Sequence, residues 1–203
     1  MIDVLPRGRH RLSREEVEAS QRARIMLALA EAMAEKGYAA TSVADVLKRA
    51  RVSRETFYEQ HDSKLDCFLR TFDAAAAVLE ASIAQAVGPT AAGAADRATL
   101  LHRAVGSYLD VLEAEPAFAR LFLVESYAAG PAAIERRAAV QARLVDALVG
   151  LLDLTSDDER VAAQALVAYI GTSVTTPLAR NDLPALAALR PSLLAAADVL
   201  LRP

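Results

Sequence analysis

The sequence predicts an all-α fold, and three observations support that prediction. Strong helix formers, above all Ala, Leu, Arg and Glu, dominate the 203 residues, whereas Gly and Pro occur only 8 times each. The alternating Val, Ile or Thr runs that mark strands do not occur. Hydrophobic residues make up 54% of the chain and charged residues 24%, a balance that excludes global disorder. A chain of this length forms one or two small domains with a hydrophobic core.

Residues 1–14 are expected to form an irregular basic arm. Basic side chains surround Pro6 and Gly8, and they are Arg7, Arg9, His10, Arg11 and Arg14. Two interpretations remain open: a solvated leader without a binding role, or an extension that reaches DNA phosphates or a minor groove.

The first helix is expected to begin near Ser13 and to end at Lys36. The Ser13 hydroxyl can cap the helix, and Glu16 three residues later completes a capping box. Gly37 then supplies a left-handed stop. Apolar residues recur at helical spacing and predict a buried stripe of Ile25, Leu29 and Met33, with Ala28 and Ala32 beside it.

A second helix is expected after Ser42, which forms a capping-box pair with Asp45, while Thr41 is a competing cap. The three-residue turn 51–53 follows, and Ser53 caps a third helix. The residues of the second helix that face inward are Val43, Val46, Leu47 and Ala50.

A fourth helix begins at Ser63, with Asp66 three residues later, and its apolar stripe is Leu65, Phe68, Leu69 and Phe72. The following Ala-rich stretch ends near Gly88-Pro89, and residues 90–96 form a loop. Longer helices are expected over 97–114, 116–128, 131–152, 157–177 and 183–201. The breaks between them fall at Pro116, Gly130-Pro131, Thr155-Ser156 and Asn181 to Pro184.

Residues 42–61, two short helices joined by a tight turn, match a helix-turn-helix. In that motif the first helix braces across the DNA backbone and the second enters the major groove. The apolar residues that pack the pair are Val43, Val46, Leu47, Val52 and Phe57. The hydrogen-bonding side chains left on the outer side of the second helix are Arg54, Glu55, Thr56, Tyr58 and Gln60.

The net charge of −3 is divided unevenly along the chain. Residues 1–70 hold 13 Lys and Arg against 11 Asp and Glu, whereas residues 71–203 hold 10 against 15. The N-terminal part is therefore the one suited to approach phosphate.

Several short motifs in this region resemble the N-terminal signature of the TetR/AcrR family of transcriptional regulators. The order and spacing fit over about fifty residues, roughly a quarter of the chain. The motifs are Gly37-Tyr38, Thr41-Ser42-Val43, Ala50, Val52-Ser53, Thr56-Phe57-Tyr58 and Ser63-Lys64. The resemblance implies an N-terminal three-helix helix-turn-helix domain (15–62, after the arm 1–14) joined to a helical ligand-binding and dimerisation domain (63–203). It also implies a regulator, usually a repressor, that binds a palindromic operator in double-stranded DNA.

The resemblance assigns roles to individual residues. Thr41 or Ser42 would contact phosphate at the start of the bracing helix. The first turn of the recognition helix would lie nearest the base edges, and Tyr58 and Lys64 would contact phosphate. The implied DNA-binding set is Thr41, Ser42, Arg51, Ser53, Arg54, Glu55, Thr56, Tyr58, Gln60 and Lys64.

Two departures from the family pattern stand out. Arg51 replaces the usual Gly of the turn, at a cost of about 1 kcal/mol if its φ is positive. Its guanidinium either contacts phosphate or is solvated. Gln60 and His61 replace the usual His and Phe. Gln60 would inherit a backbone or base contact, while His61 is expected to pack as a neutral core residue.

By the same resemblance, the helices from 97 to 152 would enclose a pocket for an unknown small-molecule effector. Its candidate contacts are His102, Tyr108, Arg120, Phe122, Glu125 and Tyr127. One helix-turn-helix makes too few base contacts for specificity, so we expect a homodimer. The apolar helices 157–177 and 183–201 are the expected dimer surface, and the small residues that permit close packing are Ala162, Ala165, Ala168 and Thr172.

An enzyme is disfavoured, because the three histidines lie far apart and no nucleophile elbow or phosphate-binding glycine loop is present. We expect no metal or other cofactor, and we expect Cys67 to be a half-buried small hydrophobe. The charge-free run 161–179 is short for a membrane span and contains several polar residues, so we expect a cytoplasmic protein without a membrane segment. The alternative function is a helical small-molecule-binding protein without operator-specific DNA binding.

Overall fold

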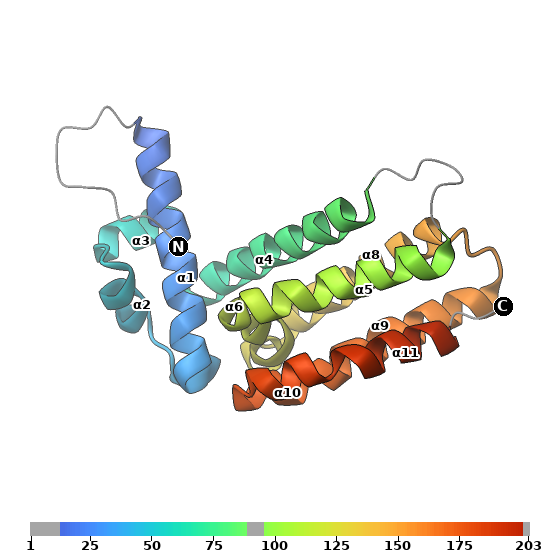
Figure 1. The fold of residues 1–203 in the computed structure, drawn as a ribbon. Coiled ribbons are helices and arrows are strands. Elements are labelled where there is room, and N and C mark those ends of the chain that lie inside the picture. The colour runs from blue at the N-terminus through green and yellow to red at the C-terminus, as the bar shows by residue number, and fades with distance from the viewer. Residues whose placement is uncertain (1–12, 89–95, 201–203) are drawn as a thin grey trace. The chain divides into compact units, whose positions relative to one another are not determined.

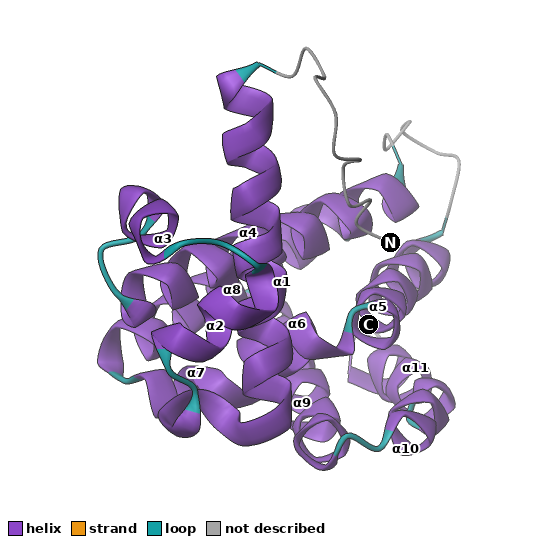
Figure 2. Ribbon diagram, turned by 90° about the vertical axis from the view of Figure 1, so that its left-hand side faces the viewer, coloured by secondary structure: helices purple, strands orange, loops and turns teal. Residues whose placement is uncertain are grey.

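The computed structural model describes residues 13–88 and 96–200, and every regular element within these ranges is a helix (Figure 1, Figure 2). Residues 1–12 of the expected basic arm 1–14 and most of the expected loop 90–96 lie outside the described residues. The chain divides after Thr71 into two compact units, an N-terminal and a C-terminal one. In chain order the helices are α1 Arg14–Ala40, α2 Val43–Ala50, α3 Arg54–Gln60, α4 Lys64–Val87, α5 Arg97–Ala114, α6 Pro116–Arg120, the π-helical turn η1 Leu121–Glu125, α7 Ser126–Ala129, α8 Pro131–Leu151, α9 Asp157–Arg180, α10 Leu183–Ala188 and α11 Arg190–Leu200.

The N-terminal unit contains α1, α2, α3 and the beginning of α4, and its helix starts are those that the sequence predicts. Ser13 caps α1 in a capping box with Glu16, and Ser42 caps α2 in a capping box with Asp45. The predicted stripe of α1 is buried together with aromatic residues of α3 and α4. This core consists of Ile25, Ala28, Leu29, Ala32, Met33, Val46, Phe57 and Phe68.

Gly37 breaks α1 as expected, with φ 78° and ψ 167°. This extended, positive-φ conformation is readily available only to glycine. The chain then makes one further turn to Ala40, and the Thr41 N–H donates to the Tyr38 carbonyl at 3.2 Å. The kink at Gly37 therefore sets the direction in which the chain enters α2.

In the C-terminal unit, α8 packs along α9, and α11 packs against both α5 and α9 (Figure 1). The predicted breaks at Pro116, Gly130-Pro131 and Ser156 are confirmed, because α6 and α8 begin at their prolines and Ser156 caps α9 in a capping box with Glu159. Within the described ranges, α9 alone is long and apolar enough to cross a membrane, a property it shares with core helices of soluble proteins.

Three boundaries differ from the sequence prediction. The expected helix 116–128 is divided into α6, a π-helical turn and α7. Helix α9 continues through Pro177 to Arg180 and stops where Asn181 takes the left-handed conformation. The expected helix 183–201 is interrupted at Leu189, beyond which the Arg190 guanidinium is tied to Asp110 and Glu113 of α5.

Candidate functional site

The turn between α2 and α3 is closed by backbone geometry that holds α3 at a defined angle. Helix α2 ends at Arg51 in the left-handed conformation, with φ 55° and ψ 47°. The Val52 N–H donates to the Leu47 carbonyl at 3.3 Å, which ties the turn back onto α2. The Ser53 hydroxyl then accepts the Thr56 N–H at 3.0 Å and caps α3.

The outer face of α3 carries polar side chains directed away from the core. Arg51, Arg54 and Glu55 are exposed around the first turn of α3, and Tyr58 is 45% exposed one turn later. Phe57, on the opposite side of α3, is buried. Thr56 is half-buried and its hydroxyl lies 2.9 Å from that of Ser53. The outer face of α3 can therefore present a guanidinium, a carboxylate and a phenol to a groove of DNA.

Three residues of the expected DNA-binding set instead make contacts inside the N-terminal unit. Thr41 is buried and its hydroxyl donates to the Gly37 carbonyl at 2.8 Å. The Lys64 ammonium donates to the carbonyls of Tyr38 and Thr41, both at 2.8 Å, and lies 4.1 Å from the Tyr38 ring centroid. Burial lowers the pKa of Lys64.

Gln60, the third of these residues, points towards α1. Its amide nitrogen lies 3.4 Å from the side-chain oxygen of Gln21, and its own side-chain oxygen is buried without a hydrogen bond. In this conformation the Gln60 side chain is turned to the core rather than to a groove.

His61 and Cys67 are both buried in the N-terminal unit. The His61 ring packs against Phe57 at a centroid distance of 5.3 Å, and neither ring nitrogen makes a hydrogen bond. Its Nδ1 lies 3.6 Å from the Asp66 carboxylate, but burial outweighs this charge and lowers the pKa of His61. His61 is therefore a packed, neutral residue, as the sequence predicts. Cys67 is fully buried rather than half-buried as expected, and this burial raises the pKa of its thiol to about 12.

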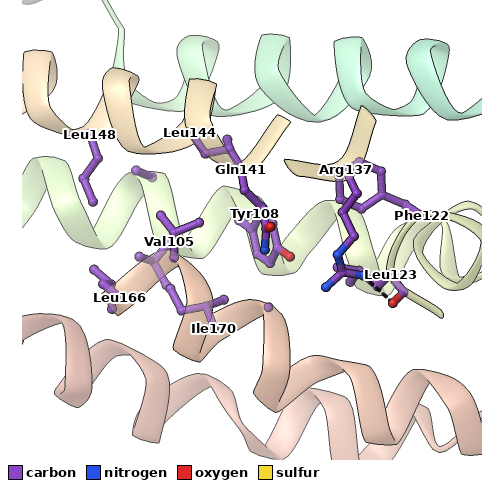
Figure 3. Close-up of a pocket in the computed structure, with 13 residues that line it drawn as sticks. Val105, Tyr108, Phe122, Leu123, Arg137, Gln141, Leu144, Leu148, Leu166 and Ile170 are labelled. Carbon is purple, nitrogen blue, oxygen red and sulfur yellow. Dashed lines mark hydrogen bonds between the residues drawn. The ribbon is translucent and has the colours of Figure 1, made fainter. Parts of the chain in front are cut away.

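The C-terminal unit encloses a mainly apolar cavity of about 80 Å³ (Figure 3). Helices α5, α8 and α9 and the π-helical turn each contribute lining residues. The lining residues are Ala104, Val105, Tyr108, Phe122, Leu123, Arg137, Gln141, Leu144, Leu148, Leu166, Val167, Ile170 and Gly171.

Arg137 is the charged residue of this lining and is only 6% exposed. Its guanidinium donates to the Leu123 carbonyl in the π-helical turn (Figure 3). It also lies 4.9 Å from the Tyr127 ring centroid. Tyr108 faces the same cavity, and burial raises the pKa of its hydroxyl, which is therefore neutral.

Residues 25–71, which include the complete α2–turn–α3 arrangement, match the model of the tetR family of bacterial regulatory proteins. The N-terminal unit therefore contains the DNA-binding domain of the TetR family. The chain is a DNA-binding transcriptional regulator.

Individual relatives agree with this assignment over most of the chain. The transcriptional activator FasR of Mycolicibacterium smegmatis is 27% identical over 179 residues, which cover 86% of this chain and 78% of that protein. A TetR-like regulator from Rhodococcus sp. RHA1 has the same fold, with a TM-score of 0.69 at 21% identity, over 91% of this chain and 97% of the other. FadR from Bacillus subtilis, solved in complex with stearoyl-CoA, has a TM-score of 0.72 at 21% identity, over 86% of this chain and 96% of the other.

The effector contacts expected from the sequence lie in different places. Tyr108 and Phe122 line the cavity. Arg120 pairs with the buried Glu125 at 3.2 Å and donates to carbonyls at the end of α9, so both are engaged within the unit. His102 is exposed and lies 2.8 Å from Asp198.

The remaining expected contact, Tyr127, is exposed, although its ring covers the Arg137 guanidinium. Arg137 and Gln141 also line the cavity but are not among the contacts expected from the sequence. A signal for Arg137 existed, because it falls in the apolar stripe of α8 formed by Ala133, Val140, Leu144 and Leu148. An arginine at a core position of an amphipathic helix is unusual and marks a site.

Proposed function

We propose that this TetR-family regulator binds a palindromic operator as a homodimer and represses transcription until an effector enters the cavity of the C-terminal unit. The observation that carries the proposal is the capped α2–turn–α3 arrangement with Arg54, Glu55 and Tyr58 exposed on one face. That geometry suits insertion of α3 into a major groove.

The proposed contacts fall into two classes. Arg54, Glu55 and Thr56 lie in the first turn of α3 and would read base edges, and the Arg54 guanidinium can pair with a guanine through two hydrogen bonds. Ser42, Arg51, Ser53 and Tyr58 would bind phosphates. Thr41, Gln60 and Lys64 would act from inside the unit by holding α1, α3 and α4 in position.

The exposed face of α9 supports the proposed homodimer. Val161 and Tyr169 are 60% and 46% exposed, and exposed small residues lie between and beyond them at helical spacing. These small residues are Ala165, Ala168 and Thr172. A strip with large apolar residues and small ones in between permits two helices to approach closely about a two-fold axis. Sedimentation should give a dimer at micromolar concentration, and Ala168→Glu should give a monomer, whereas Ala81→Glu on the exposed side of α4 should not.

The cavity supports a small effector with an apolar body, because most of its lining is aliphatic or aromatic. The stearoyl-CoA complex of FadR is consistent with an effector of this kind. Binding would widen the cavity and shift the population towards a conformation with lower operator affinity. The protein would act in the cytoplasm.

Selection of binding sites from a random duplex library tests the proposal. We expect a palindromic site whose affinity falls as salt rises, and we expect Arg54→Ala with Tyr58→Phe to abolish its recognition. Arg103→Ala, which removes an exposed arginine of the C-terminal unit, is the matched control. A selection that yields no common sequence would instead favour the alternative of a small-molecule-binding protein without an operator.

A further inference from the structure

The buried Arg137 lacks a counter-ion among the described residues, since no carboxylate lies within 4.0 Å of its guanidinium. Glu125, which precedes Arg137 in the chain, has a buried carboxylate, but this carboxylate is paired with Arg120. A guanidinium carries five N–H donors, and the Leu123 carbonyl and the Tyr127 ring face satisfy it only in part. Enclosing a charge in this way costs free energy that an anion in the cavity would recover.

The polar groups around Arg137 suit one anion of a particular shape. Tyr108 and Gln141 line the same cavity, and both can donate a hydrogen bond, the first from a hydroxyl that stays neutral and the second from its amide (Figure 3). The planar guanidinium matches the two oxygens of a carboxylate. The lining further along the cavity has no polar side chain, and it includes Leu148, Leu166 and Ile170.

We infer that the effector is an amphipathic monocarboxylate, bound with its carboxylate on Arg137, Tyr108 and Gln141 and with its apolar tail against Leu148, Leu166 and Ile170. The inference rests on the proposed ligand-responsive function and specifies the chemistry of its ligand. A neutral alcohol of equal length fills the same apolar space but leaves the guanidinium without a counter-charge. A thioester of the same acid also lacks the anionic oxygens at this position.

The size of the cavity links binding to movement. Its volume of about 80 Å³ is roughly half of the ~150 Å³ of a cavity known to admit benzene. A chain of several methylenes exceeds this volume, so it separates α5, α8 and α9 unless it extends through the open side of the cavity. Because the carboxylate would draw Arg137 away from the Leu123 carbonyl, the π-helical turn is the segment expected to respond first.

The test measures binding of matched probes to the full-length protein by isothermal titration calorimetry. The probes are hexanoate, octanoate and decanoate, the corresponding primary alcohols, and the corresponding acyl-CoA thioesters. We expect at least one carboxylate to bind more tightly than its alcohol and its thioester by about tenfold or more, the range of a charge-assisted hydrogen-bonded pair. Arg137→Gln should remove this preference, and Arg137→Lys should retain part of it. Arg143→Gln, which removes an exposed arginine of the same helix, should leave the preference intact.

The inference is overturned if no carboxylate binds, if alcohols or thioesters bind as tightly as carboxylates to the unsubstituted protein, or if Arg137→Gln keeps the preference. The comparison of probes on the unsubstituted protein remains decisive even if Arg137→Gln does not fold. Operator binding without any probe is measured in parallel. A protein that binds its operator but shows no carboxylate preference would refute the effector class alone, whereas failure of operator binding would refute the proposed function.

Discussion

Replacing Lys64 by Met is expected to destabilise the N-terminal unit without changing the salt dependence of DNA binding. The Lys64 ammonium donates to two carbonyls at the end of α1, those of Tyr38 and Thr41, and it lies over the Tyr38 ring. Methionine keeps most of the apolar stem of lysine but removes the charge and all three donors. The two carbonyls then lose their partner.

The magnitude follows from these contacts. A hydrogen bond from a charged donor contributes about 1.5–3 kcal/mol when it is buried. Lys64 is half-buried, so each of its two bonds belongs at the lower end of that range. The contact with the Tyr38 ring adds about 0.5 kcal/mol. We therefore expect the free energy of unfolding of this unit to fall by about 3–4 kcal/mol.

Two measurements on the full-length protein separate this structural role from a phosphate contact. Hydrogen exchange of the Val46 and Phe57 amides reports the opening free energy of the N-terminal unit. The slope of log affinity against log salt reports the phosphates neutralised, at about 0.9 per contact. Lys48→Met is the matched control, because Lys48 is exposed at the end of α2.

The opposite pair of results would refute the structural role of Lys64. One such result is that the two amides exchange as slowly in Lys64→Met as in Lys48→Met. The other is that the slope of log affinity against log salt is shallower by about 0.9 in Lys64→Met. Together they would show that Lys64 serves as a phosphate contact. The two carbonyls at the end of α1 would then need no side-chain partner.

Three further predictions concern single residues of the N-terminal unit. Arg51→Gly should raise the unfolding free energy by about 0.5–1 kcal/mol in urea titrations, because glycine adopts the left-handed conformation of this turn without strain. Cys67 should resist a maleimide at neutral pH and react only as the unit unfolds, since burial raises its pKa to about 12; rapid labelling without denaturant would contradict this. His61→Phe should stabilise the unit by about 1–2 kcal/mol, because it removes buried nitrogens that make no hydrogen bond. Burial lowers the folded-state pKa of His61 below its ordinary 6.5. The unfolded chain therefore takes up the proton first, and the free energy of unfolding decreases as the pH falls below 6.5. Urea titrations at several pH values should show a smaller decrease for His61→Phe.

Features that depend on neighbouring residues were predictable from the sequence. The caps at Ser13, Ser42 and Ser53 involve groups within three positions of each other, so their residue pattern suffices to place three helix starts. The left-handed conformation of Arg51 likewise depends on neighbouring residues, because Arg51 opens the short turn 51–53.

Features that depend on packing were not predictable. The residues of the π-helical turn, Leu121–Glu125, favour an ordinary α-helix by propensity, and the turn forms where the Leu123 carbonyl meets Arg137 of another helix. Thr41 and Lys64 fit a family pattern of DNA contacts. Because the kink at Gly37 leaves backbone carbonyls without helical partners, the Thr41 hydroxyl and the Lys64 ammonium donate to these carbonyls instead. A polar side chain near a binding surface thus forms a hydrogen bond with the nearest unsatisfied backbone group. A pattern of residue types does not reveal where such backbone groups lie.

The distribution of charge explains why a second copy of the chain matters for operator binding. The exposed cations around the turn are few, and Arg49 is already paired with Glu31 and Glu35. Residues 1–70 hold only two more basic than acidic side chains, 13 against 11, so the sequence-independent attraction to phosphate is weak here. Affinity must then come mainly from correctly placed base contacts, and a palindrome doubles these only for a dimer. Ala168→Glu on α9 is therefore expected to reduce operator affinity as severely as the loss of Arg54, although Ala168 lies outside the DNA-binding unit.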